Sequence, residues 1–458
     1  MLAFIILIPG ALALWVGLKR SPQEAFLLVY LPTLFLLPEY YRLDLPGVPS
    51  PTFSQAAALG TAVAFFWNRA PGYRFSPTDL LVVAFVLSAS MSEYFAGGYK
   101  DGQNLAWNLL TWALLPYLFA KSMVEPLGLR IRFAKTIVLL LAAVAVISVY
   151  EFRFGATPWR MIFDHFFPWG GRGWITTFRW GFARTAGPYG HAILAGILMV
   201  VAFRLQRWLQ WSRAWAPKPR FAPWLPIDQA TLISLVLAAG VIMTMVRGPW
   251  IGAVLAMLVI IIGRSSYRGL AIAGIVAGGL LIGIPSVMWF LDYVSVGRAG
   301  AVTVAQESAA YRWELLTAYA DIAAEKRWFG WGLTAWPQVP GMPSIDNYYL
   351  LLLLMHGQLG LGLFVALIGS MLFRLLRRGL AEPLADPPGS SLSFTLASIF
   401  VVYIISVATV YLGLQAIPML FLIAGWAEGY LRQPAMANQS AIATSTASPS
   451  HGFRRVLA

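Results

Sequence analysis

Arg247 is the side chain in this sequence that most clearly calls for a chemical partner. It stands in "TMVRGPWIG" (residues 244–252) and is the only charged residue between Leu232 and Gly263. An unpaired guanidinium in hydrocarbon costs at least a few kcal/mol. Gly248-Pro249 follows, and proline is well placed in the first turn of a helix. We therefore place Arg247 at a corner between two helices at one membrane face, either as an interface anchor or as an anion binder.

Further arginines are predicted to lie at the same face. Arg184 and Arg312 belong to two long connections, 151–190 and 291–346, that we expect to emerge there. Arginine holds phosphate oxygens through two parallel hydrogen bonds. Two or three guanidiniums around a pyrophosphate would stabilise it as a leaving group without a metal ion, by offsetting charge that develops in the transition state.

The connection at 151–190 alternates aromatic side chains with arginine. It has twelve Phe, Trp and Tyr residues. One interpretation is an interfacial segment, since Trp and Tyr favour the headgroup level and arginine reaches phosphate there. The other is a site for a lipid that carries phosphates and sugars, and both can hold together. The arginines are Arg153, Arg160, Arg172, Arg179 and Arg184.

Glycosyl transfer would also require a base that deprotonates an acceptor hydroxyl. The candidates in the outer segments are His191, Asp346, Glu314 and Glu307. His191 starts an apolar span after "GPYG", where a structural hydrogen bond is the alternative role. Asp346 precedes the span that begins at Asn347, where helix capping is the alternative. Either side chain remains a candidate, because proton abstraction requires reach before a tuned pKa.

Membrane helices are the elements that must position these residues. The chain has 458 residues, of which 59% are hydrophobic and only 11% are charged, whereas soluble domains carry about 25% charged residues. It has no cysteine and four histidines without metal-ligand spacing, so we expect neither a metal site nor a cofactor. The net charge of +14 is typical of basic cytoplasmic loops, and we expect no nucleic-acid partner.

The sequence predicts an all-α integral membrane protein with 12–13 transmembrane helices. The apolar spans lie near 3–18, 24–38, 53–67, 78–95, 104–120, 133–150, 190–205, 228–246, 248–263, 269–290, 347–373, 392–412 and 415–431. The first two are short, which leaves twelve as the alternative count. We find no convincing internal repeat.

The distribution of Lys and Arg predicts the orientation. With the N-terminus outside, 21 basic residues fall inside and 12 outside, nine of these in the two long connections. Long connections cross largely regardless of charge, so the pattern fits the positive-inside rule. The prediction is a multi-pass protein of a bacterial inner membrane, with a periplasmic active site and a cytoplasmic C-terminus.

Two regions follow from this organisation. Residues 1–433 form the predicted transmembrane catalytic domain, with periplasmic loops 151–190 and 291–346. Residues 434–458 are rich in Ala, Ser, Thr and Asn and are expected to be a disordered cytoplasmic tail. Within the second loop, 306–326 has helical periodicity. The predicted face consists of Ala309, Trp313, Leu316, Tyr319 and Ile322.

Four motifs in order resemble the O-antigen ligase and Wzy-type polysaccharide polymerase superfamily. They are "FARTAGPYGHAILAG" (182–196), "TMVRGPWIG" (244–252), "YRWELLTAYADIAAEKRWFGWGLTAW" (311–336) and "DNYYLLLLLMHGQLGLG" (346–362). Each motif alone is weak, but their order, sidedness and the long outer loop before the last are fairly specific. The resemblance covers about 180–375.

The resemblance implies a glycosyltransferase-C-like helical bundle with a helical periplasmic loop over a cavity. It also implies an inverting, metal-independent enzyme that takes a glycan from undecaprenyl pyrophosphate and works in the lipid bilayer, with a chain-length regulator as a further partner. Asp346, His191 and Arg247 would be catalytic. The pyrophosphate and glycan would be bound by Arg184, Arg247, Arg312, Glu314, Asn347, Tyr348, Trp313 and Arg179.

The motif at 346–347 departs from the ligase pattern. Ligases usually show His-Asn where this chain has Asp346-Asn347, and a Glu where it has Met355. Because that His is the ligase's candidate base, we prefer a polymerase of lipid-linked oligosaccharide repeat units, for exopolysaccharide or O-antigen synthesis. A ligase that transfers the glycan to lipid A–core is the alternative.

Two other classes remain open at this stage. A flippase or other transporter of the lipid-linked oligosaccharide would use ionisable groups at mid-membrane, of which Glu93 is an example. Transporters tend to show inverted repeats, which are absent here. A scaffold protein of a polysaccharide machine would tolerate the loss of Arg247.

Overall fold

The computed structural model describes residues 2–44, 47, 49–168, 176–219, 224, 226–342 and 344–434. This part of the chain is predominantly helical, and its only strands, β1 (Phe178–Arg179) and β2 (Phe182–Ala183), pair as an antiparallel hairpin. The predicted all-α membrane fold is thereby confirmed. Arg172 and the predicted tail beyond residue 434 lie outside the described residues.

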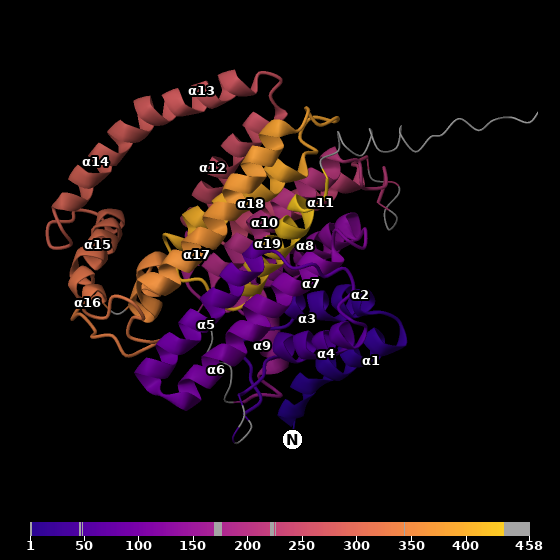
Figure 1. Cartoon of the computed structure of the whole chain (residues 1–458). Helices are drawn as coiled ribbons and strands as arrows, with labels where there is room; N and C mark the ends of the chain where they lie inside the picture. Colours follow the sequence, from indigo (N-terminus) through magenta and orange to yellow (C-terminus); the bar gives the residue numbers. More distant parts are fainter. Residues whose placement is uncertain are drawn as a thin grey trace, which may run out of the picture.

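Thirteen helical segments of the described chain run between two faces of the bundle (Figure 1). Each coincides with a predicted apolar span. In chain order they are η1–α1 (Leu2–Leu7, Ile8–Lys19), α2–η2–α3 (Pro22–Ala25, Phe26–Tyr30, Leu31–Leu36), α4 (Phe53–Trp67), α5 (Pro77–Gly97), α6–η3–α7 (Tyr99–Leu109, Leu110–Leu114, Leu115–Met123), α8 (Arg130–Phe154), α10 (Ala192–Trp211), α11 (Gln229–Met243), α12 (Arg247–Arg264), α13–η5–α14 (Arg268–Gly278, Gly279–Gly283, Ile284–Ser295), α17 (Tyr348–Ala381), α18 (Leu392–Val407) and α19 (Ala416–Leu431).

Length and apolar composition are sufficient for a membrane crossing in seven of the described helices. Five further apolar helices have 15 or 16 residues each. The first of them consists of the consecutive segments α2, η2 and α3. Shorter helices suffice where their ends meet protein rather than lipid, because backbone groups are then satisfied internally. The chain is a multi-pass membrane protein.

Successive spans alternate in direction. Gly248 at the start of α12 lies against Thr409, just after α18, and Gly263 at its end lies against Phe394 at the start of α18. These two helices are therefore antiparallel. The N-terminus and the helices of both long connections lie at one face, the lower face in Figure 1, which we call the loop face. The turn into α13 lies at the opposite face.

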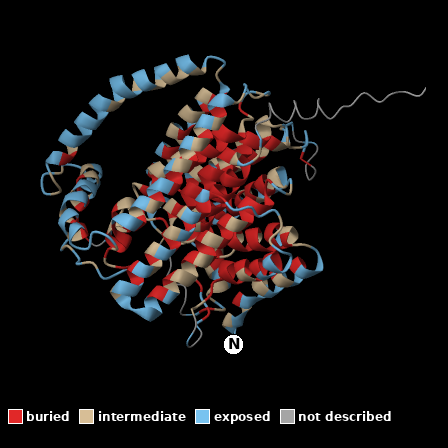
Figure 2. Cartoon of the chain, viewed as in Figure 1, coloured by how far each residue is buried: buried red, intermediate tan, exposed pale blue. Residues whose placement is uncertain are grey.

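The core is built by helices that approach closely through small residues. Gly425 of α19 lies against the Tyr117 carbonyl of α7, and Gly429 lies against the Lys121 carbonyl one turn on. Small residues allow such close backbone approach in membranes, where apolar area alone does not drive helices together. Buried residues accordingly concentrate on the central helices, including α10, α18 and α19 (Figure 2).

The α13–η5–α14 helix arches away from the rest of the bundle (Figures 1 and 2). Its 28 residues are apolar enough to span a membrane, yet the only buried residue in it is Val294. Its main contacts are with α12 and α15, its neighbours in the chain. This helix therefore presents apolar side chains in all directions, as a lipid-surrounded helix does.

The second long connection contains α15 (Val304–Ala318) and α16 (Ala320–Glu325). Leu315, Tyr319 and Ala323 form its buried face. The predicted face was wrong in part, because Trp313 and Leu316 are 42% and 40% exposed. The helix breaks after Ala318, and the cluster around Tyr319 packs on Met342, Leu350 and Leu354 rather than along one straight stripe.

The α17 helix is interrupted at Gly357, whose φ of 63° lies in the left-handed region. The segment 327–333 fills the interruption. Trp331 N–H donates to the Leu354 carbonyl at 2.7 Å, and Gly332 N–H donates to the Met355 carbonyl at 3.0 Å. Gln358 N–H in turn donates to the Arg327 carbonyl at 2.8 Å. Backbone groups freed by the break are thus satisfied by the loop, as burial requires.

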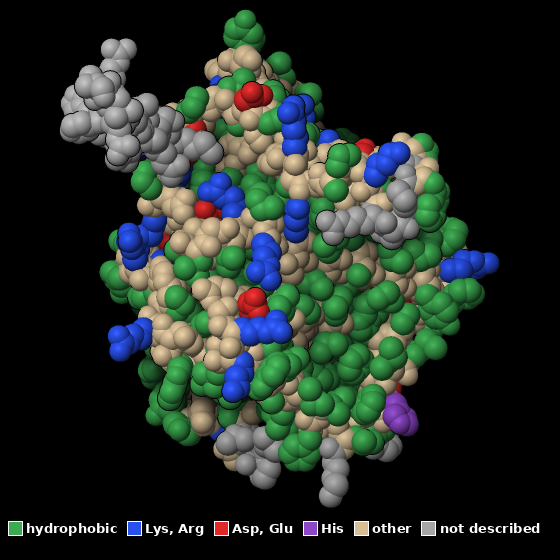
Figure 3. Space-filling model, turned by 90° about the vertical axis from the view of Figure 1, so that its right-hand side faces the viewer, with side chains coloured by type: hydrophobic (Ala, Val, Ile, Leu, Met, Phe, Trp, Pro, Cys, Tyr) green, Lys and Arg blue, Asp and Glu red, His purple; other side chains and the backbone are tan. Residues whose placement is uncertain are grey.

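Charge is spread unevenly over the surface. In the side view of Figure 3, Lys and Arg side chains are scattered over the upper and left parts, and apolar side chains cover the lower right. A continuous apolar surface is expected where lipid contacts the protein.

Candidate functional site

Arg247 lies at a tight corner between α11 and α12, as the sequence predicts. α11 ends at Met243 and α12 begins at Arg247. Between them Met245 adopts φ 48°, a left-handed conformation that is strained for a side chain of this size. Arg247 is exposed, and no hydrogen bond or ion pair joins it to another described residue. It stands at the N-terminus of an 18-residue helix, where backbone N–H groups also favour an anion.

The β1–β2 hairpin of the first long connection docks on this corner. Thr185 N–H donates to the Met243 carbonyl at 3.2 Å. Arg179 Nη1 donates to the Met245 carbonyl at 2.7 Å and so holds the strained residue. Arg184 is half-buried, and its Nη1 donates to the Thr177 hydroxyl at 3.3 Å. The structure thus brings Arg179 and Arg184 to the turn that carries Arg247.

Two guanidiniums close together make this corner electropositive. Burial lowers the pKa of Arg184, and the charge of Arg179 lowers it further. A lowered pKa means that the cationic form is disfavoured, and a bound anion would offset that cost. The arrangement therefore favours a phosphate-like ligand.

Glu151 anchors the segment that follows the hairpin. It is fully buried near the end of α8, and its carboxylate accepts the Ala186 N–H at 3.1 Å and the Gly187 N–H at 2.8 Å. Gln415 Nε2 donates to the Pro188 carbonyl at 3.2 Å from the other side. The short η4 helix (Gly187–Tyr189) is therefore fixed immediately before His191.

His191 is the N-cap of α10. Its Nδ1 accepts the Ile193 N–H at 3.1 Å, so the ring proton of the neutral form resides on Nε2. Burial lowers the pKa of His191 to about 4, with a contribution from Arg184. The side chain is therefore neutral near pH 7 and presents an N–H donor rather than a basic nitrogen.

Asp346 and Asn347 have different roles at the start of α17. Asn347 caps the helix, with its side-chain oxygen accepting the Tyr349 and Leu350 N–H groups at 3.0 and 3.2 Å. Capping therefore falls to Asn347 and not to Asp346. Asp346 is half-buried, and its Oδ1 accepts from the Ser344 hydroxyl at 3.3 Å. Tyr348 is buried against Phe364.

The α15 helix lies beside this helix start. Tyr311 donates its hydroxyl to the Ser344 carbonyl at 2.5 Å, two residues before Asp346. The next residue, Arg312, is exposed, and so is Trp313. Glu314 is held by Arg298, whose Nε donates to it at 2.7 Å and whose backbone N–H donates at 2.9 Å. These bonds lower the pKa of Glu314, so its carboxylate stays ionised and structural.

The candidate residues thus form two groups on either side of the end of α18. One group contains the arginines at the Arg247 corner, which packs through Gly248 on Thr409. The other contains Asp346 and Arg312, beside Tyr349, whose hydroxyl donates to the Ile404 carbonyl at 3.0 Å. Within the described ranges no three His, Asp or Glu side chains gather as a metal site.

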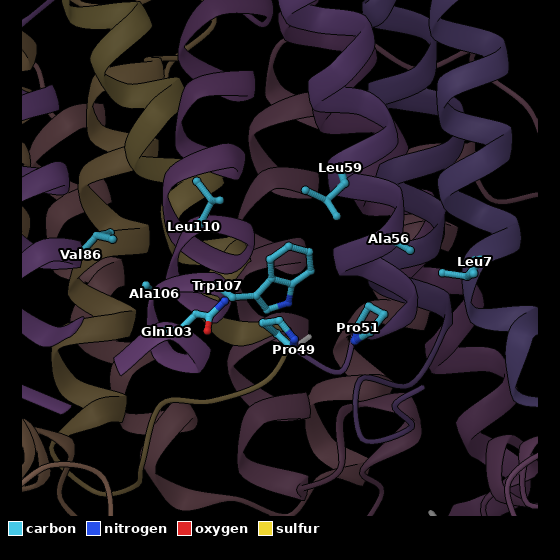
Figure 4. Close-up of a pocket in the computed structure, with 10 residues that line it drawn as sticks. All are labelled: Leu7, Pro49, Pro51, Ala56, Leu59, Val86, Gln103, Ala106, Trp107 and Leu110. Atoms are coloured by element: carbon cyan, nitrogen blue, oxygen red, sulfur yellow. The ribbon is translucent and has the colours of Figure 1, made fainter. Parts of the chain in front are cut away.

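An apolar cavity of about 700 Å³ lies toward the same face, between η1, α4, α5, α6 and η3 (Figure 4). Trp107 points into its centre, and Pro49 and Pro51 close the end nearest the loop face. A lining with so few polar atoms suits a hydrocarbon chain rather than a sugar.

Two positioning residues were missed by sequence reasoning. Glu151 could have been noticed in the sequence, because it is a lone carboxylate one turn before the end of an apolar span. Gln415 has no distinguishing feature in the sequence beyond its polarity. Glu93 has a different place from the one predicted. It lies one turn from the loop-face end of α5 and accepts the Leu333 N–H at 2.6 Å, which accounts for it as an anchor of the inserted loop.

Comparison with known proteins agrees with the motifs. Residues 232–365 match the family model described as O-antigen ligase. The matched stretch runs from α11 into α17 and contains Arg247, Arg312 and Asp346. No curated protein matches the chain. Ligases and polymerases of this type are glycosyltransferase-like enzymes. The part of the chain at residues 232–365 is therefore similar to the O-antigen ligase family.

Proposed function

We propose that this protein is a polymerase that joins lipid-linked oligosaccharide repeat units, with undecaprenyl pyrophosphate as carrier, at the periplasmic side of the inner membrane. The observation that supports it most is the Arg247 corner. An exposed guanidinium without a described partner stands at a helix N-terminus, and Arg179 and Arg184 are docked on the same turn. This combination suits a pyrophosphate better than a neutral group.

The reaction that fits is an inverting displacement. The hydroxyl oxygen of the acceptor sugar attacks the anomeric carbon of the donor glycan, and the bond from that carbon to the pyrophosphate oxygen breaks. The guanidiniums of Arg184 and Arg247 offset the negative charge that develops on the departing pyrophosphate. Asp346 takes the proton of the acceptor hydroxyl, because its carboxylate is half-buried and its one described partner is the Ser344 hydroxyl.

The lipid chain of the donor would lie in the apolar cavity around Trp107. The cavity lies toward the loop face and is lined almost entirely by apolar atoms. A polyprenyl chain is wholly apolar, so its burial there would be favourable by the hydrophobic effect.

A ligase is the second candidate, because the matching family model is described as O-antigen ligase. We favour the polymerase since Asp346 stands where ligases carry a histidine. We do not propose a transporter. Glu93, the residue that had favoured one, accepts a backbone N–H near the loop face and is not at mid-membrane.

Substitution of Arg247 tests the proposal. We expect Arg247→Ala to reduce polymerisation by about 10²–10³-fold, as the loss of one oxyanion donor does in other enzymes. Arg247→Lys should also be strongly impaired, because an ammonium cannot copy the guanidinium fork. The measurement is the length distribution of lipid-linked glycans in a deletion strain that expresses each variant.

Arg377→Ala is the matched control, since Arg377 is an exposed arginine near the other end of α17 with no described partner. It should leave chain length unchanged. Single lipid-linked repeats in the Arg247→Ala strain would support a polymerase, and long lipid-linked chains not joined to core would support the ligase. A normal length distribution at normal expression of Arg247→Ala would exclude pyrophosphate binding by this residue.

A further inference from the structure

A second arginine cluster lies at the opposite face, where α10 and α12 end and α18 begins. Arg204, Arg207 and Arg264 all point their guanidiniums at the ring of Trp211, with guanidinium carbon to ring-centre distances of 4.8, 5.0 and 4.7 Å. Arg204 also reaches Thr395 of α18, with Nη2 to hydroxyl at 3.4 Å. Three helices thus contribute to one cationic cluster.

These guanidiniums have no carboxylate partner among the described residues. The ion pairs of the described chain involve other arginines. Arg207 Nη1 donates only to the Gln210 side chain, at 2.5 Å. Arg204 is 8% exposed, and its Nε is buried without a hydrogen-bond partner. A buried guanidinium with unsatisfied donors is costly, and two further like charges nearby add to the cost.

Contact with Trp211 does not account for the cluster. A cation–π contact contributes about 0.5–2 kcal/mol, and an indole satisfies none of the N–H donors that point past it. The hydroxyl of Thr395 accepts one weak bond at 3.4 Å. The remaining donors require acceptors, and an anion with several oxygens would supply them.

We propose that Arg204, Arg207 and Arg264 bind a phosphate group at the face opposite the catalytic site. Phosphate oxygens accept bidentate bonds from guanidiniums, and a phosphate carries the negative charge that offsets three cations. The ligand is either the headgroup of an anionic phospholipid or a free phosphate. Basic pockets between helices on the inner side of membrane proteins bind lipid headgroups in this way.

Stability of the purified full chain in detergent tests the site. After removal of lipid, the thermal midpoint Tm is measured with phosphatidylglycerol, with phosphatidylcholine and with inorganic phosphate. Binding to the folded state raises Tm by an amount that grows with the logarithm of the ratio of ligand concentration to Kd. A rise with phosphatidylglycerol alone identifies a lipid headgroup, and a rise with inorganic phosphate identifies a free phosphate. No rise with either, in chain shown to be free of lipid, overturns the proposal.

The test variant is Arg207→Gln with Arg264→Gln, and the matched control is Arg213→Gln with Arg377→Gln. Both pairs remove two positive charges, but the side chains of Arg213 and Arg377 are exposed and have no described partner. We expect the apparent Kd of the effective probe to rise tenfold or more in the test variant, since each charge-assisted bond contributes about 1.5–3 kcal/mol. The control should keep the wild-type Kd.

Ligand-free stability gives an independent readout. Relief of repulsion should leave the ligand-free test variant at least as stable as the ligand-free wild type. Arg264→Gln alone gives the same comparison where the double variant is not recovered, because the Trp211 ring is the one described contact of the Arg264 guanidinium. An equal Kd in test and control variants overturns the proposal. The result is independent of the Arg247 experiment, since the two clusters lie at opposite faces.

Discussion

Asp346 and His191 are the two candidate bases, and their surroundings differ in a way that bears on catalysis. The Nδ1 of His191 already accepts the Ile193 N–H, and burial keeps the pKa of the ring at about 4. A base must have a lone pair directed at its proton, and in His191 that lone pair faces the start of α10. Asp346 has a carboxylate whose one described partner is a serine hydroxyl.

Paired substitutions separate the two residues. We expect Asp346→Asn to lower turnover by about 10²–10⁴-fold, the usual contribution of a general base, with Tm nearly unchanged. His191→Asn should keep both turnover and Tm, because Asn caps helices well, whereas His191→Ala should lose about 1 kcal/mol of stability. Turnover in membranes with a lipid-linked donor and thermal unfolding of purified protein give the two measurements.

The opposite pattern of turnover in these variants would identify His191, and not Asp346, as the base. Full turnover in Asp346→Asn together with loss of turnover in a stable His191→Asn variant would show that the imidazole of His191 is the base. That result would leave the Arg247 assignment intact, since leaving-group stabilisation and deprotonation of the acceptor are separate steps.

Residue-level expectations succeeded where local sequence dictates local geometry. The Arg247 corner follows from a lone charge before Gly-Pro in an apolar run, and Asp346-Asn347 follows from polar residues before a span. The division of labour between Asp346 and Asn347 depends on which side chain faces the helix N–H groups, and no local pattern fixes that choice. Glu151 and Gln415 escaped notice because their partners lie 35 and 227 residues away.

At the scale of elements, the loop 327–333 and the break in α17 depend on each other. Gly330 and Gly332 both have positive φ, at 71° and 81°, and Gly357 has a φ of 63°. A Cβ at Gly357 would meet the Trp328 carbonyl. The sequence signals a helix break at neither Gly357 nor its neighbours, since the apolar run continues. The break is stable because backbone groups of the loop form the hydrogen bonds that the helix loses there.

Gly357→Ala should therefore undock the loop. The added Cβ meets the loop backbone and the left-handed φ is strained, so we expect a loss of about 1–3 kcal/mol in the free energy of unfolding. Protease sensitivity of 327–333 should rise at the same time. Gly362→Ala is the control on the same helix, because its Cβ would meet nothing within 4 Å. Equal stability of the two variants would show that the break does not hold the loop.

At the scale of the whole molecule, the position and order of the helices were predicted best. Each of the thirteen predicted spans has a helix in the described chain, because long apolar runs separated by basic turns leave little choice of structure. The path of α13–η5–α14 was not predictable. Its sequence is as apolar as that of the enclosed helices, and its glycines, such as Gly274, Gly278 and Gly283, would by themselves favour close packing against a neighbouring helix.

The absence of cysteine makes the orientation directly testable. Val302 precedes α15 at the loop face and is 88% exposed, and Ser266 lies in the exposed turn between α12 and α13 at the opposite face. With 21 of 33 basic residues in the connections of the opposite face and the tail, the positive-inside rule places the loop face outside the cytoplasm. In intact cells with a permeable outer membrane, a membrane-impermeant maleimide should label Val302→Cys and not Ser266→Cys. Both should react after the inner membrane is disrupted, and the unmodified chain is the blank. The reverse pattern would put the Arg247 corner in the cytoplasm, where a donor that has crossed the membrane could not reach it.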